Sequence, residues 1–176
     1  MRSPQSSVTT PILSHDGRDL AAALLTIQAG DNRERLCAAV DAAFPGRKLE
    51  IISNDERPFS KTPRASEFAV ALETEGCSRL LEARELSDGT LKYLCLVASL
   101  LSPIPPAMIA LNEPEASLHP DLLRPLAALI VDASRRSQIW VSTHSPVLVE
   151  AIETLADIRS IRLLMRNGET LIQHDD

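Results

Sequence analysis

Acidic and amide side chains follow directly on an apolar stretch in the second half of the chain. Residues 107–111 have the pattern of a short buried strand, and Asn112, Glu113 and Glu115 come within four residues of its end. A carboxylate in this position is held by the strand yet exposed, a placement suited to holding magnesium and polarising water in phosphoryl transfer. The alternative is a turn whose acids serve the N-terminus of a helix predicted to begin near Pro120.

A second polar stretch stands at the start of a predicted helix, residues 88–101. Ser87, Gly89 and Thr90 combine hydroxyl groups with a backbone that lacks a side chain, at a point where helical N–H groups face outward. Such a helix start is suited to binding an anion such as a phosphate. The alternative is that Ser87 is an ordinary N-cap.

A third polar stretch contains a histidine and follows another short apolar segment, residues 138–142. His144 lies there between Thr143 and Ser145. Ligands of open parallel sheets bind just beyond the carboxyl ends of the strands. Glu113 and His144 are therefore expected to share one cleft, with a structural hydrogen-bonding role as the alternative for the histidine.

The elements that must position these residues change character halfway along the chain. The first half reads as two helices, starting near residues 16 and 31, followed by extended segments typical of a small antiparallel layer. The second half alternates helices (88–101, 120–134, 146–155) with strands (107–111, 138–142), the pattern of a parallel sheet with helices on its faces. We therefore expect a flexible lead (1–15), a helical and extended lobe (16–86) and an α/β core (87–176).

Smaller features complete these expectations. A helical stripe of Leu91, Leu94, Cys95, Ala98 and Leu101 is predicted to be core. Trp140 is expected in core or inter-lobe packing. Asn167-Gly168 stands between two apolar runs and predicts a hairpin that closes the edge of the sheet.

Composition favours an ordinary globular chain without the basic surface that binds the phosphate backbone of nucleic acids. Hydrophobic residues make up 44% and charged residues 24% of the 176 residues, and the net charge of -6 comes without a basic block. Cys37, Cys77 and Cys95 form no CxxC pair, so they are expected to be apolar fillers in a reducing compartment. No apolar run approaches the roughly 18 residues of a membrane span. A cytoplasmic location without membrane contact is expected.

Four of these stretches, in this order, resemble the motifs of the ATP-binding-cassette ATPases. LSDGT (86–90) resembles the signature motif, MIALNEP (108–114) the Walker B strand, ASLHP (116–120) the D-loop and STHSP (142–146) the switch-histidine loop. The resemblance is to the RecF-like and SMC-like branch of predicted ATPases. It implies a P-loop NTPase-like α/β fold, a parallel sheet with flanking helices beside the small helical and antiparallel lobe.

The resemblance also implies roles at the strand ends. In this family Glu113 would be the general base that orients the attacking water, and His144 would hydrogen-bond the γ-phosphate of ATP. Asn112 stands where the family usually has an aspartate that holds Mg²⁺ through water. An amide oxygen can accept from metal-bound water but brings no charge, so weaker magnesium binding is expected.

The remaining motif residues imply a dimer. Ser87 and Gly89 would bind the γ-phosphate of a nucleotide held on the opposite subunit. Ser117, Leu118 and His119 would lie at the interface between the two nucleotide sites. The implied cofactors are ATP and Mg²⁺, and the implied partner is a second copy or a P-loop half. DNA binding rests on family analogy alone, and the net negative charge of the chain does not favour it.

One departure limits the resemblance, because the sequence contains no G-x-x-x-x-G-K-[ST] motif. The phosphate cradle and its lysine are missing, so the chain resembles the back two-thirds of such a domain, incomplete at its N-terminus. Hydrolysis would then require a P-loop from elsewhere. The alternative function is a non-hydrolysing interaction or regulatory module that keeps the dimer face.

Overall fold

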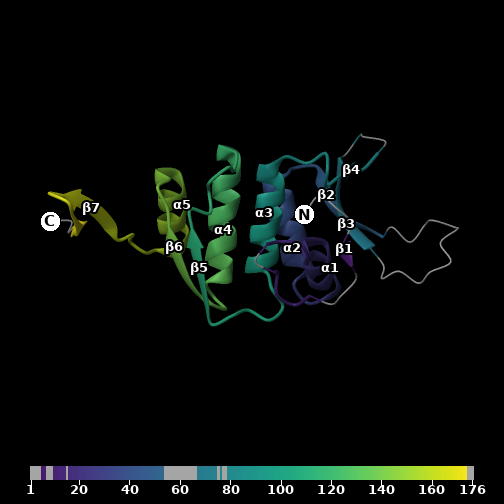
Figure 1. Cartoon of the computed structure of the whole chain (residues 1–176), viewed down its shortest axis with the longest axis horizontal. Coiled ribbons are helices and arrows are strands. Elements are labelled where there is room, and N and C mark those ends of the chain that lie inside the picture. Colours follow the sequence, from purple (N-terminus) through teal and green to yellow (C-terminus); the bar gives the residue numbers. More distant parts are fainter. Residues whose placement is uncertain are drawn as a thin grey trace, which may run out of the picture.

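A computed structural model describes residues 5–6, 10–14, 16–53, 67–74, 76 and 79–173. The helices of residues 20–43, 88–100 and 123–133 lie between an antiparallel sheet on one side and a parallel strand pair on the other, with a C-terminal hairpin beyond that pair (Figure 1). This arrangement is a mixed α/β fold, as the alternation of helices and strands in the sequence predicts.

The first half forms the helical pair and the antiparallel sheet. Its elements are β1 (Gln5–Ser6), α1 (Leu20–Ala29), α2 (Arg33–Ala43), β2 (Arg47–Ser53), β3 (Glu67–Thr74) and β4 (Leu81–Glu82). β3 pairs antiparallel with β1, β2 and β4. β4 is only two residues long, because the Glu85 carboxylate binds the Arg79 guanidinium and the N–H of Glu82 and so closes a turn directly after it. The loop between β2 and β3, residues 54–66, lies outside the described residues.

The second half alternates helices and strands as predicted. Its elements are α3 (Asp88–Leu100), β5 (Met108–Asn112), a short 3-10 helix η1 (Pro120–Leu122), α4 (Leu123–Ala133), β6 (Gln138–Ser142), α5 (Pro146–Ala156), β7 (Arg162–Arg166) and β8 (Glu169–Gln173). β5 and β6 pair in parallel from Met108 opposite Gln138 to Asn112 opposite Ser142. The two strands therefore end level with each other.

The core lies among α1, α2, α3 and α4. Leu91, Leu94, Ala98 and Leu101 of the predicted stripe are buried, and Cys95 is half-buried. Tyr93 on the same helix is also buried, and burial raises the pKa of its hydroxyl to about 12. That hydroxyl donates to the Ala39 carbonyl over 3.2 Å, and its ring meets Phe44 edge-on with centroids 5.5 Å apart. These contacts fix α3 against α2.

The parallel pair buries one face and exposes the other. Ile109, Leu111, Ile139 and Val141 pack against the core, whereas the alternate residues of both strands are exposed. The expectation that Trp140 is buried in core or inter-lobe packing is wrong, because its position in β6 faces away from the helices and leaves it 61% exposed.

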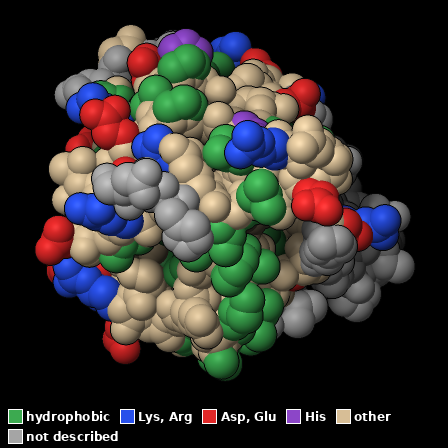
Figure 2. All heavy atoms as spheres, turned by 90° about the vertical axis from the view of Figure 1, so that its left-hand side faces the viewer, with side chains coloured by type: hydrophobic (Ala, Val, Ile, Leu, Met, Phe, Trp, Pro, Cys, Tyr) green, Lys and Arg blue, Asp and Glu red, His purple; other side chains and the backbone are tan. Residues whose placement is uncertain are grey.

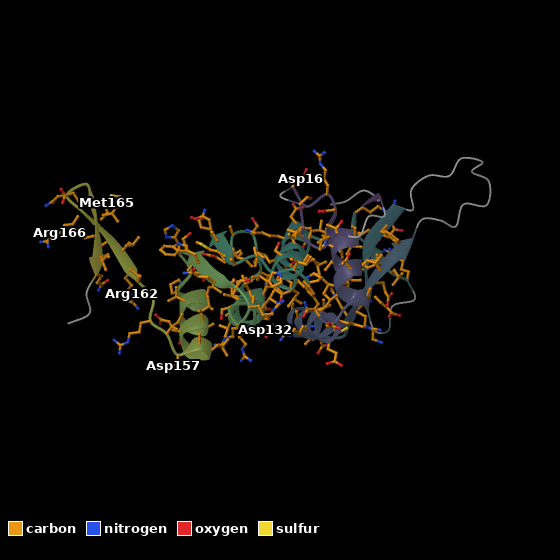
Figure 3. The ribbon with its side chains drawn as sticks, turned by 90° about the horizontal axis from the view of Figure 1, so that it is seen from below. Asp16, Asp132, Asp157, Arg162, Met165 and Arg166 are labelled. Carbon is orange, nitrogen blue, oxygen red and sulfur yellow. The ribbon has the colours of Figure 1, made fainter. Side chains whose placement is uncertain are left out.

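The C-terminal hairpin is present but does not close the parallel sheet. β7 and β8 pair only with each other, and all ten of their residues are exposed. Arg162, Met165 and Arg166 lie clear of the body in Figure 3, and Figure 2 shows hydrophobic side chains gathered in a band at this end. The asparagine-glycine turn therefore predicts the hairpin correctly but not its place.

Two further expectations concern cysteines and membranes. Cys37 is exposed and so is not the apolar filler expected, because it lies on the outer face of α2, and Cys77 lies outside the described residues. Within the part of the chain that is described, no helix is both long and apolar enough to cross a bilayer.

A pair of leucine truncations tests this account of the core. Leu126 in α4 is fully buried, so Leu126→Ala should lower the free energy of unfolding by about 2–5 kcal/mol through the cavity it leaves. Leu163 in β7 is 63% exposed, and Leu163→Ala should cost less than about 1 kcal/mol. Urea unfolding followed by circular dichroism measures both changes. Equal effects of the two substitutions would contradict the burial described.

Candidate functional site

The turn after β5 holds Glu113 in an uncommon backbone conformation. Glu113 has a φ of 44° and Ser117 a φ of 67°, both in the left-handed region. The N–H of Glu113 donates to the Ser142 carbonyl over 2.8 Å, and its own carbonyl accepts from the N–H of Ala116 over 3.0 Å. Non-glycine residues in this region cost on the order of 1–3 kcal/mol each and collect at functional sites. The strained turn is thus anchored to the end of β6.

The candidate catalytic side chains meet at the ends of the two parallel strands. Glu113 Oε1 lies 3.4 Å from His144 Nε2, and both side chains are exposed. Beside them the Ser142 hydroxyl donates to Asn112 Oδ1 over 2.6 Å. The structure therefore brings together Asn112, Glu113 and His144, as the strand-end pattern in the sequence predicts.

Glu115 binds the histidine loop rather than facing outward with Glu113. One of its carboxylate oxygens accepts from the hydroxyl of Thr143 and from the N–H of His144, the latter over 3.1 Å. Burial alone would raise the pKa of Glu115, but these hydrogen bonds outweigh it and hold the pKa below its usual value. The carboxylate is therefore ionised at neutral pH and fixes the loop that carries His144.

The start of α3 shows the N-cap predicted from LSDGT, and the anion-binding interpretation stays a prediction. Ser87 is the N-cap, and its hydroxyl accepts from the N–H of Thr90 over 3.1 Å. The same side chain is exposed at the N-terminus of a 13-residue helix. A Cβ at Gly89 would lie 2.7 Å from the Ser117 carbonyl oxygen, so only glycine allows α3 to approach residues 116–120, the segment predicted to be a D-loop, this closely. This contact joins two motifs that are 28 residues apart.

Four candidate residues line one open hollow of about 570 Å³ between α2, α3 and the D-loop: Ser87, Gly89, Ser117 and His119. His119 turns toward η1, where its Nδ1 accepts from the N–H of Asp121 over 3.3 Å. The strand-end residues Glu113 and His144 do not line this hollow. The candidate residues thus form two groups, joined by the turn from Glu113 to Ser117.

Two oxygen-bearing side chains, Asn112 and Glu113, stand at the end of β5. The described ranges contain no group of three or more His, Cys, Asp or Glu side chains that could hold a metal ion. Asn112 and Glu113 offer oxygen ligands side by side, and Mg²⁺ is usually bound through one or two such groups together with substrate phosphates and water. The donor set fits Mg²⁺ that arrives with a nucleotide.

Sequence reasoning did not assign Lys92 and Thr143 to the site. The Lys92 ammonium donates to the Ala116 carbonyl over 2.6 Å, and Thr143 is the hydroxyl partner of Glu115. Lys92 lies three positions after Gly89, on the same face of α3. The three-residue spacing from Gly89 was the sequence signal that could have placed Lys92 near the site. The turn that Lys92 contacts, however, lies far along the sequence.

This fold is shared with ATPase head domains of SMC proteins. The Smc head domain with a coiled coil and joint from Pyrococcus yayanosii is 22% identical, with a TM-score of 0.57 over 80% of this chain and 26% of that one. The Smc head bound to the C-winged helix domain of ScpA is 19% identical, with a TM-score of 0.59 over 93% of this chain and 54% of that one. The SMC head domain from Thermotoga maritima is 18% identical, with a TM-score of 0.54 over 89% and 52%. The chain thus spans about a quarter to a half of the length of these proteins.

The family match and the shared fold together support an ATPase domain of the RecF-like and SMC-like type. More specifically, residues 5–150 match the family described as "AAA domain, putative AbiEii toxin, Type IV TA system", and the chain belongs to that family. No match is found among curated proteins.

The contact between α3 and the D-loop is tested by two glycine substitutions. Gly89→Ala should lower the free energy of unfolding by about 1–3 kcal/mol, because the new methyl group forces two backbones apart. Gly30→Ala is the control, because its Cβ would come no closer than 3.5 Å to any neighbour; it should change stability by less than about 1 kcal/mol. Thermal and urea unfolding measure both. A stabilised Gly89→Ala variant would show that α3 and the D-loop are not in contact.

Proposed function

We propose that this chain supplies the signature, Walker B, D-loop and switch-histidine parts of an ATPase, which hydrolyses ATP with Mg²⁺ at a dimer interface once a P-loop half completes it. The observation that carries the proposal is the Glu113–His144 pair, held at the level ends of two parallel strands. Membership of an AAA domain family supports nucleotide binding.

In this proposal the strand-end residues act on water and on the terminal phosphate. The Glu113 carboxylate orients the attacking water and takes its proton, since it is exposed and fixed by the bond between its N–H and Ser142. His144 would donate from Nε2 to the γ-phosphate, and Asn112 would help to hold Mg²⁺ through its amide oxygen. When bound, Mg²⁺ neutralises charge on the phosphates.

The start of α3 then serves a nucleotide held by a second subunit. The Ser87 hydroxyl and the first N–H groups of α3 bind its γ-phosphate, with Gly89 leaving the backbone accessible. Ser117 and His119 line the same hollow and lie at the interface between subunits. A dimer would therefore contain two sites, each built from both subunits.

The exposed face of the parallel pair supports a partner at this side of the molecule. Met108 and Trp140 are 51% and 61% exposed on neighbouring strands, and large exposed apolar patches mark interaction sites. The partner in this proposal is a P-loop half or a second copy.

One compared structure concerns ATP-driven dimerisation and DNA-stimulated activation of SMC ATPases, and two others contain a domain of ScpA. DNA binding by this chain stays an analogy, and a cytoplasmic location stays an expectation.

A second candidate function is a non-hydrolysing interaction or regulatory module. Two observations favour it: the sequence has no P-loop motif, and Asn112 replaces the usual Walker B aspartate. Such a module would keep the hollow at α3 and the D-loop while lacking turnover.

This polypeptide alone should bind ATP weakly or not at all. The missing P-loop normally supplies the lysine and the backbone N–H groups that surround the phosphates. Isothermal titration calorimetry with Mg·ATP should therefore show no micromolar binding. A fusion with a P-loop half is the positive control and should bind. Micromolar affinity of the isolated chain would contradict the prediction.

Glutamine substitutions at the two glutamates separate the roles at the end of β5. In the completed ATPase, Glu113→Gln should lower kcat by about a hundredfold or more, the usual worth of a general base, with ATP affinity nearly unchanged. Glu115→Gln is the matched control. Its remaining carbonyl oxygen can still accept from Thr143 and from the N–H of His144, so turnover should change far less.

The assay is steady-state phosphate release together with equilibrium ATP binding. With hydrolysis blocked in Glu113→Gln, ATP should also hold two subunits together through Ser87 and Gly89. If both variants hydrolyse ATP at the wild-type rate, neither carboxylate takes part in hydrolysis. Glu113 is then not the general base that the ATPase proposal requires.

A further inference from the structure

The ammonium group of Lys92 is bound to the backbone of the strained turn after β5. Its Nζ donates to the Ala116 carbonyl over 2.6 Å and lies 3.4 Å from the Glu113 carbonyl. These acceptors are 24 and 21 residues away in the sequence. The cation of α3 thus contacts the same peptide segment that positions the Glu113 carboxylate.

The carbonyl groups of this turn need hydrogen-bond donors that keep the turn in its conformation. Glu113 and Ser117, at its two ends, have left-handed backbone conformations. The Glu113 carbonyl accepts from the N–H of Ala116, and the Glu115 carbonyl accepts from the N–H of Leu118. A charged donor makes hydrogen bonds roughly twice as strong as a neutral one. Lys92 is therefore suited to keeping the turn closed in this conformation.

A second contact from the same face of α3 fixes the helix along the turn. Gly89 precedes Lys92 by one helical turn and meets the Ser117 carbonyl with no room for a Cβ. Lys92 contacts the carbonyls of Glu113 and Ala116, and Gly89 contacts that of Ser117. A shift of α3 along the turn would break the Lys92 contacts or force Gly89 into the Ser117 backbone.

We propose that Lys92 is a positioning residue that fixes Glu113 relative to the phosphate-binding start of α3. The inference rests on the proposed function. In the proposed dimer, Glu113 serves the nucleotide of its own subunit, whereas Ser87 and Gly89 serve the nucleotide of the other. Lys92 then connects the two nucleotide sites, because a displacement of α3 at one site moves the Glu113 turn at the other.

Hydrogen–deuterium exchange on the full chain tests the link without requiring activity. Lys92→Met keeps the aliphatic stem and removes the charge, so the hydrogen-bonded amides of Glu113, Ala116 and Leu118 should exchange at least about tenfold faster while α1 and α4 stay unchanged. Lys92→Arg should restore slow exchange. Lys48→Met, at an exposed position of β2, is the control and should change nothing in the turn. Wild-type exchange of the amides of Glu113, Ala116 and Leu118 in Lys92→Met, or faster exchange throughout the core, would overturn the proposal.

Kinetics in the ATPase completed by a P-loop half give the second measurement. Lys92→Met should lower kcat about tenfold or more with KM for ATP changed less than about twofold, and Lys92→Arg should recover most of the rate. Equal turnover of Lys92→Met and the wild type would overturn the positioning role. If the completed wild type does not hydrolyse ATP, the proposed function fails instead, and the exchange experiment alone decides about Lys92.

Discussion

The hydrogen bond from the N–H of Glu113 to the Ser142 carbonyl is the interaction on which the candidate site depends. It continues the parallel pairing of β5 and β6 by one residue, because Asn112 already lies opposite Ser142. The chain then turns sharply in a left-handed conformation, so the Glu113 carboxylate comes beside His144. Without this bond the two strand ends would carry the same residues but would not present them together.

Two charged side chains attach the turn after β5 to further segments, one to the loop of His144 and the other to α3. The Glu115 carboxylate holds the loop of His144 through Thr143, and the Lys92 ammonium holds the turn against α3. α3 is itself fixed to α2 by Tyr93. The Glu113 turn and the His144 loop are therefore attached to neighbouring elements through backbone groups, which favours a fixed geometry for the two side chains.

The sequence predicts those features that depend on local pattern. Helical periodicity gives the buried stripe of α3, and alternating strands and helices give a parallel pair whose ends bring Glu113 and His144 together. Features that depend on distant chain segments were not predicted. The apolar pattern of β6 cannot tell whether both faces are covered, so the exposure of Trp140 was missed. Likewise, nothing local to Lys92 indicates the carbonyls that it reaches 24 residues away.

The most direct test of the central claim, that a P-loop half completes this sheet, uses the single tryptophan of the chain. Trp140 lies exposed on the outward face of β6, where such a half would pack. The measurement is its fluorescence emission and acrylamide quenching in the chain alone and in a fusion with a tryptophan-free P-loop half. The account predicts shorter-wavelength emission and weaker quenching in the fusion. Identical emission and quenching, in a fusion whose ATP binding shows that the P-loop half is folded, would contradict it.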